Sequence, residues 1–193
     1  MYLVFDTETT GLPKNWKAPI DDLDNWPRLV QIAWLVFDEE GQELSSQCRI
    51  IKPQGFEIPE DATRIHGIST KRASRDGVEL NAALDEFSGG INRSEFLVAH
   101  NMKFDEMIVG AEFLRQGIDN CLQGIPKICT QEKSTYFCRL PNPRGYGYKW
   151  PKLSELHRTL FGHHFEDAHD AMVDARACAK CFFELKRRNL IIN

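Results

Sequence analysis

The hydrophobic pattern of the chain changes near Pro53, and this change constrains the fold more than any other feature. Before Pro53, residues 2–6 and 29–37 have the apolar composition of buried strands, and residues 43–51 continue as a third strand with partial alternation. A polar turn at residues 38–41 separates the second strand from the third, as in an antiparallel hairpin. After Pro53, apolar residues recur mostly at helical spacing. Hairpin strands followed by alternating helices and strands predict an α/β domain with a mixed sheet.

The second part of the chain contains one further short apolar strand and several helical segments. We predict the strand over residues 96–100 and helices over residues 59–66, 78–87, 102–116, 152–161 and 168–189. The sequence Ser88-Gly89-Gly90 is expected to end the second of these helices. A length of 193 residues and a hydrophobic content of 42% fit one folded unit, so we expect residues 1–193 to form a single domain.

Carboxylates gather at the predicted strand ends. Asp6 and Glu8 are two residues apart, so on an extended backbone their side chains point to the same side. Like charges facing one way repel unless a cation lies between them, and clustered carboxylates suit Mg²⁺. Taken alone, the pair is better explained as a solvated strand end or a helix cap, and Asp105 as an acid in the first turn of a helix.

A third segment, residues 168–175, combines a histidine with two acids. On a regular helix His169 and Asp174 would lie about 140° apart, at roughly 100° per residue. They can share a site only if His169 lies at or before the helix start. Asp170 suits the N-cap of that helix, which would leave Asp174 projecting from the helix body.

These segments, in this order, resemble the three exonuclease motifs of the DnaQ-like superfamily, in its DEDDh branch. The matching strings are FDTETTG at residues 5–11, HNMKFD at 100–105 and HDAMVDA at 169–175. The branch includes the proofreading ε subunit of bacterial DNA polymerase III and ribonuclease T. The resemblance runs from residue 2 to about residue 180. It implies a ribonuclease H-like fold, with a five-stranded mixed sheet flanked by helices, and one exonuclease domain.

The resemblance also implies roles for individual residues. Asp6, Glu8, Asp105 and Asp174 match the metal-binding carboxylates, and His169 matches the general base of a catalytic set of five. Thr9 and Asn101 match positions near the terminal nucleotide. The implied activity is 3′→5′ hydrolysis of phosphodiesters, with two Mg²⁺ or Mn²⁺ ions per site and release of nucleoside 5′-monophosphates.

The bulk charge leaves the substrate open. A net charge of −4 argues against binding nucleic acid by bulk electrostatics, although two divalent ions would offset it. We expect a nucleic acid with a free 3′ end as partner, with single-stranded DNA preferred, and a DNA polymerase subunit as an optional one. An RNA-trimming exoribonuclease and a non-catalytic nucleic-acid-binding module of the same fold are the alternatives.

Two loops lie between the predicted elements. The segment 139–150 mixes cations with aromatic residues and suits either base stacking or packing on the domain, whereas residues 14–26 are expected to form a solvated surface loop.

Cys178 and Cys181 favour a buried helix face over a metal site, so no structural zinc is expected. His163 and His164, near Glu166, are expected at the surface. The chain shows neither an apolar run long enough to span a membrane nor a secretory signal, so we expect no membrane contact and a cytoplasmic location.

Overall fold

The computed structural model describes residues 1–143, 145–165 and 169–191. It contains a five-stranded mixed sheet in the order β3-β2-β1-β4-β5. The strands are β1 (Tyr2–Thr9), β2 (Leu29–Phe37), β3 (Glu43–Ile50), β4 (Phe96–Ala99) and β5 (Lys127–Cys129). β1 pairs antiparallel with β2 and parallel with β4. The predicted mixed sheet is therefore confirmed, and β1 lies at its centre.

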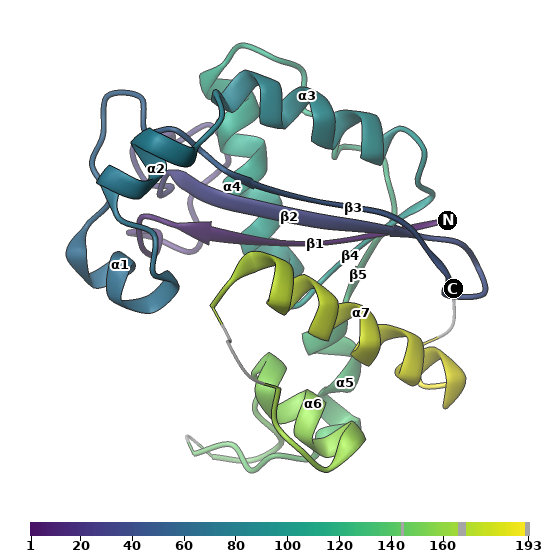
Figure 1. Cartoon of the computed structure of the whole chain (residues 1–193). Coiled ribbons are helices and arrows are strands. Elements are labelled where there is room, and N and C mark those ends of the chain that lie inside the picture. The colour runs from purple at the N-terminus through teal and green to yellow at the C-terminus, as the bar shows by residue number, and fades with distance from the viewer. Residues whose placement is uncertain (144, 166–168, 192–193) are drawn as a thin grey trace.

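Helices cover both faces of the sheet (Figure 1). They are α1 (Glu60–His66), α2 (Thr70–Asp76), α3 (Leu80–Ile91), α4 (Met102–Arg115), α5 (Thr130–Cys138), α6 (Leu153–Phe161) and α7 (Ala171–Arg187). One core joins α3 and α4 to side chains of β1 and β2 such as Phe5 and Trp34. A second core joins α6 and α7 to the opposite side chains of β1, such as Val4. The alternation along β1 thus supplies apolar side chains to both layers.

Several predicted boundaries need correction. β1 extends to Thr9 rather than ending at Asp6, because its pairing with β2 continues through Glu8 and Thr9. Glu8 therefore lies within the strand. The glycines at 89 and 90 do not end α3, which continues to Ile91. A Cβ on Gly90 would lie 3.0 Å from the Leu3 side chain and 3.1 Å from the Trp34 indole nitrogen. This glycine lets α3 pack closely against the sheet.

Three elements were absent from the prediction: α2, β5 and α5. β5 has only three residues, which is too short for a hydrophobic pattern. α5 is rich in polar residues and presents no clear apolar stripe. The last predicted helix begins at Ala171, and Ala168 lies outside the described residues. Among the described residues, none of the helices is long and apolar enough to cross a membrane.

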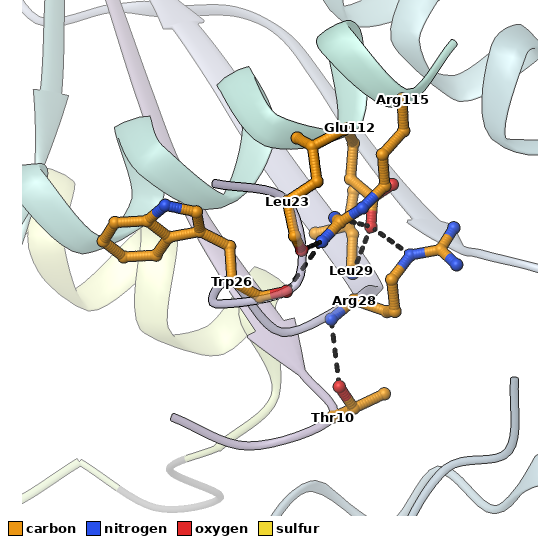
Figure 2. Close-up of polar contacts among 7 residues, drawn as sticks. All are labelled: Thr10, Leu23, Trp26, Arg28, Leu29, Glu112 and Arg115. Atoms are coloured by element: carbon orange, nitrogen blue, oxygen red, sulfur yellow. Dashed lines mark hydrogen bonds and ion pairs between the residues drawn. The ribbon is translucent and has the colours of Figure 1, made fainter. Parts of the chain in front are cut away.

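A buried ion-pair network anchors the loop after the first motif (Figure 2). Glu112 on α4 is fully buried, and its carboxylate accepts hydrogen bonds from Arg28 Nε and from the backbone N–H of Leu29, both at 2.9 Å. Arg115 lies 3.0 Å from the same carboxylate and donates to the carbonyls of Leu23 and Trp26 at 2.6 and 2.7 Å.

The same loop is partly internal. Trp26, at 3% exposure, and Asn25, at 5%, are buried. The expectation that residues 14–26 form a merely solvated loop is therefore wrong, although its acidic residues Asp21 and Asp22 are exposed. Trp26 packs in the core beside α3 and α4, and Arg115 donates to loop carbonyls from about 90 residues away, a pairing that sequence patterns do not predict.

Candidate active site

The predicted catalytic residues come from three elements: Asp6 and Glu8 lie on β1, Asp105 lies in the first turn of α4, which follows β4, and His169 and Asp174 lie at the start of α7. Possible ligand atoms of Glu8, His169 and Asp174 all lie within 4.8 Å of one another. Asp6 lines the same pocket, which has a volume of about 480 Å³. Ligands bind characteristically at the carboxyl ends of strands in α/β sheets. Four of the five residues thus meet around one pocket.

Asp105 lies behind this group. Its side chain is 2% exposed and accepts a hydrogen bond of 2.7 Å from the Thr7 hydroxyl. Thr7 lies between Asp6 and Glu8 on β1. The residue that holds Asp105 is therefore flanked by two carboxylates of the pocket. Asp105 still acts on the group electrostatically, because it is one cause of the raised pKa of Asp6.

The start of α7 follows the predicted arrangement. Asp170 is the N-cap, and its carboxylate accepts from the N–H groups of Met172 and Val173 at 3.0 and 3.2 Å. His169 precedes the helix in the left-handed region, with φ of 76°. This conformation lets the His169 N–H donate to Asp174 Oδ2 at 3.0 Å. The turn brings two residues together that a regular helix would hold apart.

Gln31 positions this turn and was missed by the sequence analysis. Its side chain, 3% exposed on β2, donates to Asp170 at 3.2 Å and accepts from the Ala171 N–H at 3.0 Å. Gln31 pairs with Glu8 in the sheet register. The available signal was a single amide in the otherwise apolar segment 29–37. A buried polar side chain needs hydrogen-bond partners, and here they belong to the site.

The electrostatics of the pocket favour binding of a cation. Burial, followed by the charges of Asp105, Asp174 and Glu8, raises the pKa of Asp6 well above its ordinary value. Burial, followed by Asp174, raises the pKa of Glu8 to about 8. Burial raises the pKa of Asp105 to about 7, although the hydrogen bond from Thr7 opposes this. The pocket therefore gathers more carboxyl groups than the cationic side chains around it can neutralise.

One carboxylate oxygen directly supports a metal ligand role. Asp174 Oδ1 is buried and has no hydrogen-bond partner among the described residues, whereas Oδ2 accepts from His169. An unpaired buried acceptor is costly unless something binds it. Carboxylate oxygens are the ligands that Mg²⁺ and Mn²⁺ prefer. The residues present therefore fit a divalent metal ion.

Two neighbouring cavities adjoin the carboxylate pocket. One, of about 460 Å³, shares Thr7 and Glu8 with it and includes Thr9. The other, of about 430 Å³, shares Asn101 and Gln131. Thr9 and Asn101, predicted near the terminal nucleotide, thus line different cavities beside the carboxylates. Asn101 also has a left-handed backbone, with φ of 72°.

The remaining predicted features also have defined places. Cys178 and Cys181 are fully buried in the core of α7, which confirms the buried helix face. His163 and His164 are exposed, as predicted, whereas Glu166 lies outside the described residues, as does Arg144 of the 139–150 loop.

Comparison with known proteins agrees with this geometry. The family model RNase_T, described as exonuclease, matches residues 3–182. The PolC-type DNA polymerase III of Latilactobacillus sakei is 25% identical over 188 residues, which cover 96% of this chain and 11% of that protein.

Solved structures show the same fold. E. coli Exonuclease I in complex with a dT13 oligonucleotide matches with a TM-score of 0.77 and 20% identity, over 97% of this chain and 41% of that one. Exonuclease I from Methylocaldum szegediense matches with a TM-score of 0.75 and 19% identity, over 97% and 40%. The chain thus spans less than half of these solved chains and about a tenth of the polymerase. On the family match, the chain belongs to the RNase_T exonuclease family, within the DnaQ-like 3′→5′ exonuclease superfamily.

Proposed function

We propose that this protein is a metal-dependent 3′→5′ exonuclease that releases nucleoside 5′-monophosphates from single-stranded nucleic acid, with DNA as the preferred substrate. The observation that carries the proposal is the meeting of Glu8, His169 and Asp174 within 4.8 Å, beside Asp6. A general base next to clustered carboxylates is the arrangement that metal-assisted phosphodiester hydrolysis requires.

The carboxylates would hold the metal. Asp6, Glu8, Asp105 and Asp174 are the proposed ligands of two Mg²⁺ or Mn²⁺ ions. When bound, such ions neutralise the phosphate charge and lower the pKa of a coordinated water. Asp105 is held in place by Thr7, and Asp174 by the His169 backbone.

His169 is the proposed general base. A neutral imidazole has a ring nitrogen that can accept the proton of the attacking water. Its side chain is exposed to the pocket rather than packed in the core. The left-handed backbone at His169 and the hydrogen bonds between Gln31 and the start of α7 hold the backbone from which this side chain projects.

The cavity beside Thr9 suits the terminal nucleoside. Leu12 and Ile65 line it and are 72% and 58% exposed, and the buried His66 lines it as well. None of its lining residues is Lys or Arg, whereas Glu8 and Asp61 contribute negative charge. A terminal nucleoside with a free 3′-hydroxyl carries no further phosphate, so this cavity would accept a 3′ end and repel a continuing strand.

The preference for DNA rests on the relatives. A PolC-type DNA polymerase is similar in sequence, and the similar Exonuclease I was solved with dT13. The same similarity suggests a DNA polymerase subunit as a partner. RNA trimming is the second candidate. A site distinguishes RNA from DNA by contacts that recognise or exclude the 2′-hydroxyl, and no motif residue specifies such contacts.

The test uses purified protein with 5′-labelled single-stranded DNA or RNA of equal sequence. We expect a ladder that shortens from the 3′ end in Mg²⁺ or Mn²⁺ and none in EDTA, with DNA degraded faster. Asp174→Ala should abolish the metal-dependent cleavage. Asp85→Ala, which removes an exposed carboxylate on α3, is the matched control and should cleave like wild type. Binding of either strand without cleavage in both metals would favour the non-catalytic module instead.

The role of His169 needs a substitution that tolerates its backbone. His169→Ala should lower turnover more than binding, but alanine is strained at a φ of 76°. Asparagine adopts this conformation more readily than alanine. His169→Asn should therefore lower kcat by roughly 10²- to 10⁴-fold with little change in substrate affinity. Near-wild-type turnover of this variant would refute the assignment.

A further inference from the structure

The cavity on the Asn101 side of the carboxylates has a composition unlike that of the terminal-nucleoside cavity. Trp16 and Trp150 line it, at 45% and 60% exposure, together with Lys17 and Lys103. Glu132 is its one carboxylate among the described residues. The two cavities therefore differ in charge, because one contains carboxylates without Lys or Arg and the other contains two lysines.

The two tryptophans belong to loops that are far apart in sequence and are each held in place. Trp16 lies in the 14–26 loop, whose carbonyls at Leu23 and Trp26 are bound by Arg115. Trp150 precedes Pro151, whose carbonyl accepts from His100 Nε2 at 3.0 Å and from Gln131 at 3.2 Å. The two exposed rings therefore project from segments whose backbone is held to the domain. Holding the backbone in advance reduces the entropic cost of binding.

An aromatic path connects this cavity to the terminal-nucleoside cavity. The rings of Trp16 and Phe104 have centroids 5.7 Å apart, and Phe104 lines the cavity beside Thr9. Of the ten large apolar side chains that are exposed among the described residues, four line these two cavities: Leu12 and Ile65 in one, and Trp16 and Trp150 in the other. Exposed apolar groups gathered along one path indicate a binding surface.

We propose that Trp16 and Trp150 bind unpaired bases of the substrate strand on the 5′ side of the scissile phosphate. This inference rests on the proposed function and specifies its substrate as a single strand several nucleotides long. Tryptophan rings stack on any base, so the site would tolerate sequence variation. Lys17 and Lys103 would attract the phosphates of the continuing strand. A base within a duplex has both faces covered, so paired ends would bind poorly here.

The test compares two substrates that differ in length. One is a 5′-labelled oligothymidylate, and the other is the 4-nitrophenyl ester of thymidine 5′-monophosphate, which has one nucleotide and no upstream strand. For Trp16→Ala and Trp150→Ala we expect kcat/KM on the oligonucleotide to fall roughly 5- to 150-fold. Hydrolysis of the ester should fall much less, because only one ring, that of the leaving group, lies on the 5′ side of its phosphate. Phenylalanine at either position should restore most of the loss.

Two controls separate stacking from folding. Tyr136→Ala removes an exposed ring from α5 that does not line the cavity, and should leave both substrates unaffected. A single abasic residue placed in turn at each position upstream of the scissile phosphate should impair wild type at positions near the cavity, and impair the alanine variants less at the same positions.

The outcomes distinguish the two proposals. If wild type hydrolyses neither substrate, the proposed function fails. If wild type hydrolyses both and the tryptophan variants match it on the oligonucleotide, the function stands and the stacking site is refuted. Equal losses on the ester and the oligonucleotide would assign the tryptophans to structural support and would also refute the site.

Discussion

Two residues with left-handed backbones, Asn101 and His169, line the carboxylate pocket. Only four non-glycine residues have positive φ in the described part of the chain, so half of them are at this site. Such conformations cost about 1–3 kcal/mol and persist where the surroundings impose them. The structure around the pocket therefore holds Asn101 and His169 in strained backbone conformations that place their side chains at the site.

His100 gives a prediction at the scale of one residue. Burial lowers the pKa of His100 to about 4, against about 6.5 in an unfolded chain. Between these values the unfolded state binds more protons, so stability is lost as the pH falls through that window. The difference of about 2.5 pKa units corresponds to roughly 3 kcal/mol. His100→Gln removes this titration. Between pH 7 and pH 4, the unfolding free energy of the variant should therefore fall by roughly 3 kcal/mol less than that of wild type.

Urea denaturation at several pH values measures this difference. His164→Gln changes an exposed histidine and should retain the pH dependence of wild type. Parallel pH profiles for wild type and His100→Gln would show that His100 does not contribute to acid sensitivity.

At the scale of elements, the sequence predicted some parts of the site better than others. The N-cap at Asp170 is a local signal and was predicted correctly from its neighbours, whereas the first strand was predicted to end at Asp6 and continues to Thr9. The contact of Thr7 with Asp105 and of Gln31 with the start of α7 was not predictable. These hydrogen bonds join residues 98 and 140 positions apart, and their partners are determined only by the packing of strands and helices.

The network around Glu112 gives a prediction for α4 and the loop that it anchors. Glu112 is fully buried between Arg28 and Arg115 (Figure 2). Removing one partner of a buried ion pair typically costs about 3–5 kcal/mol, because the remaining charge is left uncompensated. Glu112→Gln should therefore lower the unfolding free energy by roughly 3 kcal/mol and make residues 14–26 more sensitive to proteolysis.

A partly exposed ion pair on the same helix provides the control. Glu106 lies 3.2 Å from Lys127, and both side chains are partly exposed. Glu106→Gln should cost at most about 1 kcal/mol and leave the loop protected. A similar loss of stability in both variants would contradict the anchoring role of Glu112.

The charge of the whole molecule depends on what occupies the carboxylate pocket. The chain carries a formal net charge of −4, and its densest buried negative charge lies at Asp6, Glu8, Asp105 and Asp174. Two divalent ions would bring the formal charge to neutrality. Because the 430 Å³ cavity adds lysines on one side only, the strand would meet positive charge at the metal site and along its 5′ side.

Metal binding should therefore change the stability of the whole fold in a pH-dependent way. The folded pKa values of Glu8, about 8, and Asp105, about 7, exceed the ordinary carboxyl value near 4. The metal-free folded state binds more protons between these limits, so its stability falls as the pH rises from about 4 to 8. Metal needs the deprotonated carboxylates, so its stabilisation grows over the same interval.

At 100 times the Kd, Mg²⁺ or Mn²⁺ adds about 2.7 kcal/mol, or roughly 5–10 °C in Tm. We expect this rise at pH 8 and a much smaller one at pH 5, measured by thermal denaturation against EDTA-treated protein. Asp174→Asn should reduce the rise at pH 8, whereas equal rises at both pH values would mean that the metal binds elsewhere.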